Sequence, residues 1–124
     1  MSDKTIITFV AEDGPVTVEV MTGNQTAGKY SISVSDGGPY EMVGKGYLGD
    51  GIPDSFLIRY HGDDLVRRGM FILGTYASAE THGGKVKVSY IFCQNAEEIG
   101  RAEIDESSNK AKIYTNLIIF KKRG

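Results

Sequence analysis

Apolar and polar residues alternate along most of the chain. In residues 86–92, valine, tyrosine and phenylalanine occupy every second position, with lysine, serine and isoleucine between them. Residues 30–35 repeat the pattern, with serine as the intervening residue. Because successive side chains of a β-strand point to opposite faces, a period of two predicts strands with one face in a core.

Turn residues interrupt this pattern often enough to predict roughly eight to ten short strands. The first two strands, residues 4–11 and 16–20, flank the sequence Glu-Asp-Gly-Pro and are predicted to form a hairpin. Helical character is confined to residues 94–100, so we expect at most one short helix, near residues 95–99. The run Met-Phe-Ile-Leu at residues 70–73 predicts a strand buried on both faces.

These elements predict an all-β fold. The expected architecture is an antiparallel sandwich of two sheets, and the alternative is a closed barrel, either up-and-down or Greek-key. Parallel strand units need long helical connections, and the sequence indicates none. With 124 residues, the chain has the length of one domain, which we expect to span residues 1–124.

Composition and charge narrow the possible partners. The formal charge is −2, and three of the 14 basic residues are Lys121, Lys122 and Arg123, so the remainder is acidic and disfavours nucleic acid. No apolar run approaches the ~20 residues of a membrane span. Cys93 is the single cysteine, which excludes an intrachain disulfide. Together with an N-terminus that lacks a signal-like pattern, this predicts a cytoplasmic protein.

Glycine is concentrated in one segment, since six of the 16 glycines lie in residues 36–54. We expect irregular backbone there, with short strands near residues 41–43 and 45–48. Dense glycine is typical of bulges and of backbone that passes close to another group. The segment also carries Tyr40 and Tyr47, and exposed aromatic rings beside polar groups can bind a sugar or a peptide.

Asp50 and Asp54 end this segment in a string that resembles the second half of a calcium loop. Gly46 and Leu48 stand where the first two carboxylates would be, so we predict no metal site. We also predict no catalytic residue and no cofactor. The glycine spacing of residues 44–49 precedes no helix, as a dinucleotide site would require.

The sequence therefore favours a small binding module over an enzyme. Its expected partner is a small polar molecule, a carbohydrate or a protein, bound through residues 36–54. The candidate ligand-binding residues are Tyr40, Tyr47, Asp50, Asp54, Arg59 and His61. One alternative is an enzyme whose pocket uses Arg59, Tyr60, His61 and Asp63. A second alternative is a subunit of a homo-oligomer, in which a partner chain covers strands that are apolar on both faces.

Overall fold

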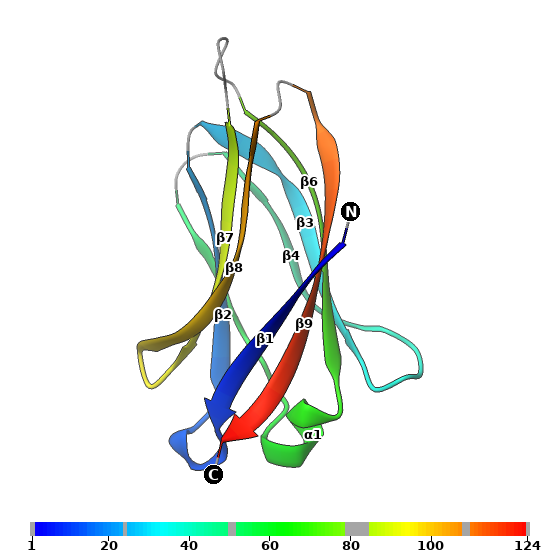
Figure 1. The fold of residues 1–124 in the computed structure, drawn as a ribbon, viewed down its shortest axis with the longest axis vertical. Helices are drawn as coiled ribbons and strands as arrows, with labels where there is room; N and C mark the ends of the chain where they lie inside the picture. The colour runs from blue at the N-terminus through cyan, green and yellow to red at the C-terminus, as the bar shows by residue number, and fades with distance from the viewer. Residues whose placement is uncertain (1, 24, 50–51, 79–84, 108–109, 124) are drawn as a thin grey trace.

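The computed structural model describes residues 2–23, 25–49, 52–78, 85–107 and 110–123, in which two sheets pack face to face (Figure 1). One sheet has five strands in the order β1-β9-β6-β3-β4, and the other has four in the order β5-β2-β7-β8. The strands are β1 (Ser2–Val10), β2 (Val16–Gly23), β3 (Thr26–Ser35), β4 (Glu41–Leu48), β5 (Asp54–Leu57), β6 (Gly69–Ser78), β7 (Lys85–Gln94), β8 (Glu97–Ser107) and β9 (Lys112–Arg123). The predicted all-β sandwich is confirmed, and the barrel alternative is wrong because two separate sheets form.

The first two strands do not form the predicted hairpin. β1 pairs in parallel with β9, whereas β2 lies in the other sheet between β5 and β7. A short 3-10 helix, η1 (Ala11–Asp13), carries the chain between the sheets. The buried Gln94 side chain holds this crossing, because its amide accepts from the Val10 N–H and donates to the carbonyls of Val10 and Gly14. The pairing of the first strand with the last makes one strand pair parallel in an otherwise antiparallel sandwich.

The short helix also lies elsewhere than predicted. Asn95 and Ala96 have φ values of 53° and 62°, and they form the two-residue turn between β7 and β8. Positive φ at both positions is the requirement of a tight hairpin turn, so the strand pattern resumes at once and no helix forms near residues 95–99. The helix α1 is Gly62–Val66, where Asp63 and Asp64 occupy the first turn.

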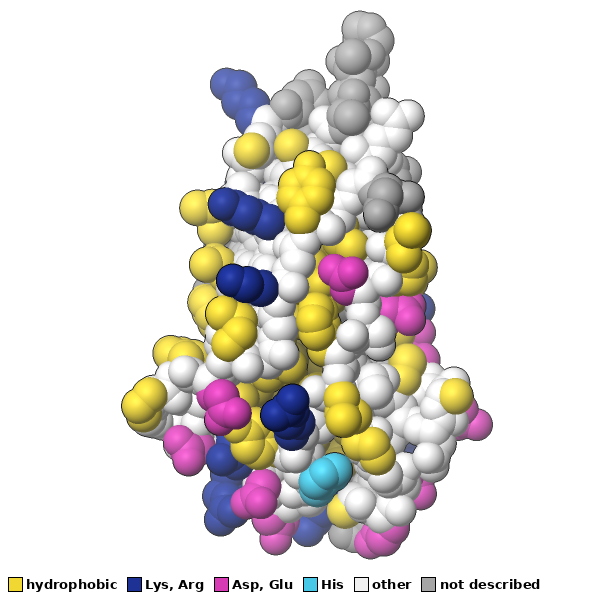
Figure 2. All heavy atoms as spheres, turned by 180° about the vertical axis from the view of Figure 1, so that it is seen from behind, with side chains coloured by type: hydrophobic (Ala, Val, Ile, Leu, Met, Phe, Trp, Pro, Cys, Tyr) yellow, Lys and Arg dark blue, Asp and Glu magenta, His cyan; other side chains and the backbone are white. Residues whose placement is uncertain are grey.

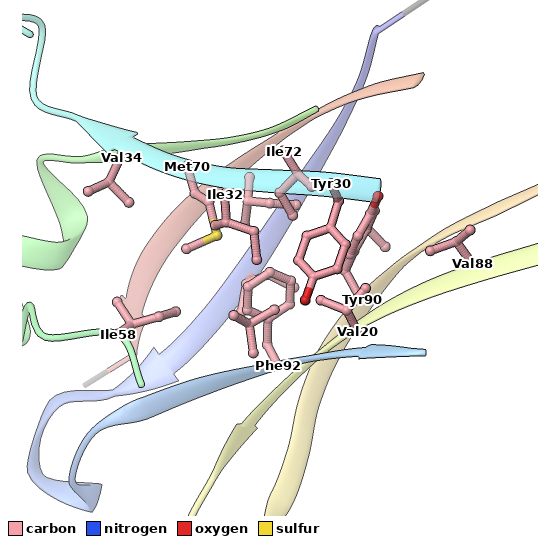
Figure 3. Packing of buried hydrophobic residues seen from close by; sticks show 14 of the residues in the cluster. Val20, Tyr30, Ile32, Val34, Ile58, Met70, Ile72, Val88, Tyr90 and Phe92 are labelled. Atoms are coloured by element: carbon pink, nitrogen blue, oxygen red, sulfur yellow. The ribbon is translucent and has the colours of Figure 1, made fainter. Parts of the chain in front are cut away.

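The core fills the space between the sheets. Side chains from β3 and β6 point toward those from β2 and β7, as Figure 3 shows for Ile32, Ile72, Val20 and Phe92. The outward side chains of β6 are less buried than predicted. Met70 and Ile72 are buried, but Leu73 is 41% exposed, so the expectation of burial on both faces is wrong for this strand. No helix or strand of the described part of the chain packs over that outer face.

Candidate functional site

The predicted irregular segment is largely a single strand. β4 runs from Glu41 to Leu48 and pairs with β3 throughout. The register shifts once, since Ile32 pairs with Gly44 while Ser33 pairs with Met42. Val43 is therefore the extra residue of a β-bulge, which explains why the sequence suggests two short strands rather than one. β4 is an edge strand of its sheet, and it contacts β5, the edge strand of the other sheet.

Two glycines of β4 allow β5 to approach. A Cβ atom at Gly44 would overlap the Phe56 ring, and a Cβ atom at Gly46 would lie 2.5 Å from a carboxylate oxygen of Asp54. The Tyr30 hydroxyl donates to the same Asp54 oxygen at 2.5 Å. Burial and this hydrogen bond hold the pKa of Tyr30 above its usual value. The glycine content of β4 therefore has a structural cause, because side chains from β3 and β5 occupy the space beside its backbone.

A hollow of about 360 Å³ lies where β4 and β5 meet. The view from behind shows exposed hydrophobic side chains along this edge, with charged groups of both signs among them (Figure 2). The walls of the hollow come from the beginning of β4, from β5 and from two residues of the segment that joins β5 to α1. Its lining residues are Glu41, Met42, Val43, Ser55, Phe56, Leu57, Arg59 and Tyr60.

One side of the hollow is organised by hydrogen bonds and charge. The Tyr60 hydroxyl donates to the Glu41 carboxylate, and the Arg68 guanidinium carbon lies 3.8 Å from the centre of the Tyr60 ring. The hydrogen bond to Glu41 is the main reason that the pKa of Tyr60 is raised. The Tyr60 hydroxyl thus holds the Glu41 carboxylate in place at the edge of the hollow.

Arg59 differs from the other arginines near this edge. Arg67 forms an ion pair with Asp64, and Arg68 donates to the Asp64 carbonyl and stacks on Tyr60. Arg59 is exposed at the hollow and makes no ion pair with any residue that the structure describes. A guanidinium has five N–H donors in a planar fork, so Arg59 can bind a carboxylate or phosphate through two of them.

The candidate residues from the sequence fall in different places. Tyr40 and Tyr47 lie at the two ends of β4, seven positions or about 20 Å apart, and both are exposed. Neither lines the hollow, and the ring of Tyr40 packs against Phe71 on the outer face of the five-stranded sheet, 6.2 Å between ring centres. Asp54 bonds to Tyr30 beneath β4, and Asp50 lies outside the described residues.

The four residues suggested for an enzyme pocket do not line one site in the structure. Arg59 and Tyr60 line the hollow, whereas exposed His61 precedes α1 and is not among the lining residues. Asp63 accepts from the Lys122 ammonium at 2.8 Å, and this bond lowers its pKa. The sequence reasoning missed Glu41 and Met42, since their role depends on β4 lying beside β5, which local patterns do not reveal.

No three acidic, histidine or cysteine side chains among the described residues come together in a way that could hold a metal ion. None of the helices formed by those residues is long and apolar enough to cross a bilayer. Cys93 is half-buried on β7, and burial raises the pKa of its thiol.

Comparison with known proteins gives little further information. No family model and no curated protein matches the sequence. Among solved structures, the chain is similar to the crystal structure of a domain of unknown function, DUF4425, from Bacteroides vulgatus. The two are 17% identical over 84% of this chain and 92% of that chain, with a TM-score of 0.41.

Proposed function

We propose that this protein is a binding module that holds a small hydroxylated anion, such as a sugar acid, in the hollow between β4 and β5. The observation that carries the proposal is the exposed guanidinium of Arg59, which has no ion-pair partner among the described residues and lies beside the hydrogen-bonded pair of Glu41 and Tyr60. Arg59 would bind the ligand's carboxylate, and Glu41 would accept from its hydroxyl groups.

The apolar walls suit the same class of ligand. Met42 and Leu57 are 56% and 54% exposed, and Phe56 forms part of the lining. Such side chains can pack against the C–H groups of a sugar ring, while the few polar groups fix its orientation.

Calorimetric titration with sodium glucuronate tests the proposal. The wild-type protein should bind glucuronate more tightly than glucose, which lacks the carboxylate. Arg59→Ala should weaken glucuronate binding by at least about tenfold, because it removes a charge-assisted bidentate contact. Arg101→Ala is the matched control, since Arg101 is also an exposed arginine but already pairs with Glu98 and Glu103.

The result that would contradict the proposal is equal affinity of wild type and Arg59→Ala, or no heat of binding for glucuronate at millimolar concentration. Glu41→Gln provides a second variant. It keeps the shape of the side chain but weakens acceptance from hydroxyl groups, so the affinity for both sugars should fall.

A further inference from the structure

The outer face of the five-stranded sheet is apolar at its centre. Six outward side chains from β1, β6 and β9 form this centre: Ile6, Phe71, Leu73, Ile113, Leu117 and Ile119. Ile6 is 49% exposed and Ile113 is 62% exposed, and the register places Phe71 opposite Leu117. Exposed apolar side chains that are contiguous, rather than scattered, mark an interaction surface.

Lysines flank this centre on two sides. Lys29 and Lys45 lie on β3 and β4 at one border, and Lys4 and Lys121 lie on β1 and β9 at the other. Each of these lysines points to the same side of the sheet as the apolar centre. Lys29, for example, is opposite Thr75, which lies two positions from Leu73. No aspartate or glutamate among the described side chains shares this phase on the five strands.

These four lysines also lack internal partners. None of them forms an ion pair with a residue that the structure describes. On the outer face of the four-stranded sheet the opposite holds, since Lys85 pairs with Asp105 and Arg101 pairs with Glu98 and Glu103. The two faces therefore differ in kind: one is neutralised by its own carboxylates, and the other leaves its positive charge available.

We propose that the outer face of the five-stranded sheet docks on an anionic lipid surface. The lysines would contact the headgroups from both borders, while the apolar centre lies against the boundary with the acyl chains. A hollow of about 550 Å³ between Lys29 and Lys45, with Leu73 and Thr75 in its lining, gives one headgroup a place between two ammonium groups. Tyr47, 72% exposed beside Lys29, adds an aromatic ring of the type enriched at membrane interfaces.

The type of basic residue favours lipid over a protein partner. Protein interfaces are enriched in arginine and depleted in lysine, whereas this face carries four lysines and a single arginine, Arg123 at the end of β9, among its described outward residues. A second copy of the chain is also disfavoured. Stacking two identical faces would bring lysine borders together with no carboxylates to offset them.

The charge of the rest of the chain would orient the protein. Without these four lysines, ten basic residues face 16 acidic ones, a formal charge of −6. An anionic surface would therefore attract the lysine-bearing face and repel the remainder. The net charge of −2 does not reveal this separation of charge, because it sums the lysine-bearing face and the acidic remainder.

Vesicle co-sedimentation tests the proposal. At low salt, wild type should bind phosphatidylcholine vesicles that contain about a third phosphatidylserine, and should not bind pure phosphatidylcholine vesicles. The double variant Lys29→Gln/Lys45→Gln should reduce the partition coefficient by about tenfold or more, since each lysine near the surface contributes several-fold. Lys85→Gln/Lys87→Gln is the matched control: it removes the same charge from the four-stranded sheet and should leave the partition coefficient nearly unchanged.

A second variant tests the apolar centre. Leu73→Ser/Ile113→Ser should lower binding several-fold at unchanged charge. Both side chains are exposed, so circular dichroism should show that the fold is kept. The proposal fails if the charge-matched variants lose binding equally, or if wild type ignores the anionic vesicles. It also fails if light scattering shows a dimer that Leu73→Ser/Ile113→Ser converts to a monomer, because the occupant of the face is then a second copy.

Discussion

At the edge formed by β4 and β5, the exposed Arg59 lies beside a hollow. Its guanidinium forms no ion pair with a carboxylate of any described residue. At the opposite edge, on β8, the exposed Arg101 donates to Glu98 at 2.9 Å and lies 3.6 Å from Glu103. Arg59 lies just after β5 and Arg101 lies on β8, and β5 and β8 are the two edge strands of the four-stranded sheet. The difference indicates that Arg101 is used within the protein, whereas Arg59 is available to another molecule.

The two edges also differ in how tightly the sheets approach. At the first, Gly44 leaves space for the rigid Phe56 ring, and at the second, Gly100 lies beside the flexible end of Ile7. We expect Gly44→Ala to destabilise the protein by about 1–3 kcal/mol, because the ring and β4 must separate. Gly100→Ala should cost less than about 1 kcal/mol. The added Cβ would lie 2.7 Å from the Cδ1 methyl group of Ile7, which can rotate away, and alanine is better tolerated than glycine within a strand.

Urea denaturation of the two variants measures this difference. If Gly44→Ala and Gly100→Ala lowered the free energy of unfolding equally, the close approach of β5 to β4 would not be what the glycine provides.

The hydrogen bond beneath β4 gives the next largest effect. Tyr30→Phe should lower the free energy of unfolding by about 1 kcal/mol, since the half-buried Asp54 loses its donor. Asp54→Asn is the matched variant, because an amide oxygen can still accept from Tyr30 and the loss should be smaller. Residue-resolved NMR titration should also show a lower Tyr30 pKa in Asp54→Asn, because the carboxylate charge helps to raise it.

The hydrogen-bonded pair of Tyr60 and Glu41 allows a test in which only the charge of the acceptor changes. Glu41→Gln should lower the pKa of Tyr60 toward its ordinary value, as followed by the ring-carbon shifts of labelled tyrosine. A raised tyrosine pKa contributes stability below its unfolded pKa, and that contribution is lost as pH rises through the folded pKa. The difference in stability between wild type and Glu41→Gln should therefore shrink in strongly alkaline solution, and an unchanged Tyr60 pKa would show that the bond is absent.

The smallest effect is expected at the second edge. Arg101 lowers the pKa of Glu98, so the pair contributes stability at neutral pH and loses it as pH falls through the folded pKa of Glu98. Arg101→Ala should therefore be slightly less stable than wild type at neutral pH and equal to it in acid, whereas Arg59→Ala should match wild type at both. Thermal unfolding at two pH values measures this. A loss of stability in Arg59→Ala would mean that Arg59 has an internal role after all.

The sequence predicts the fold class because alternation such as that in β7 depends only on neighbouring positions. It does not predict the pairing of β1 with β9, since these strands come from opposite ends of the chain. The hairpin prediction failed for the same reason: a turn sequence indicates a change of direction but not the sheet to which the chain returns.

The site was predictable only in part. Arg59 is among the candidate residues from the sequence, and the structure places it at the hollow. Tyr40 and Tyr47 lie in the glycine-rich segment, but the phase of β4 turns Tyr47 toward the outer face, and the ring of Tyr40, just before β4, packs against Phe71 on that face. Glu41 could not be singled out, because its contact with Tyr60 joins the start of β4 to the segment after β5, which is a strand of the other sheet.

The most direct test of the central claim is a map of amide shifts in the wild-type protein on addition of glucuronate. If the hollow binds the ligand, the largest shifts will fall in residues 41–43, 55–57, 59 and 60, which line it. Shifts confined to residues 36–40 and 47–49, at the two ends of β4, would place binding at the exposed tyrosines instead and contradict the assignment of the hollow.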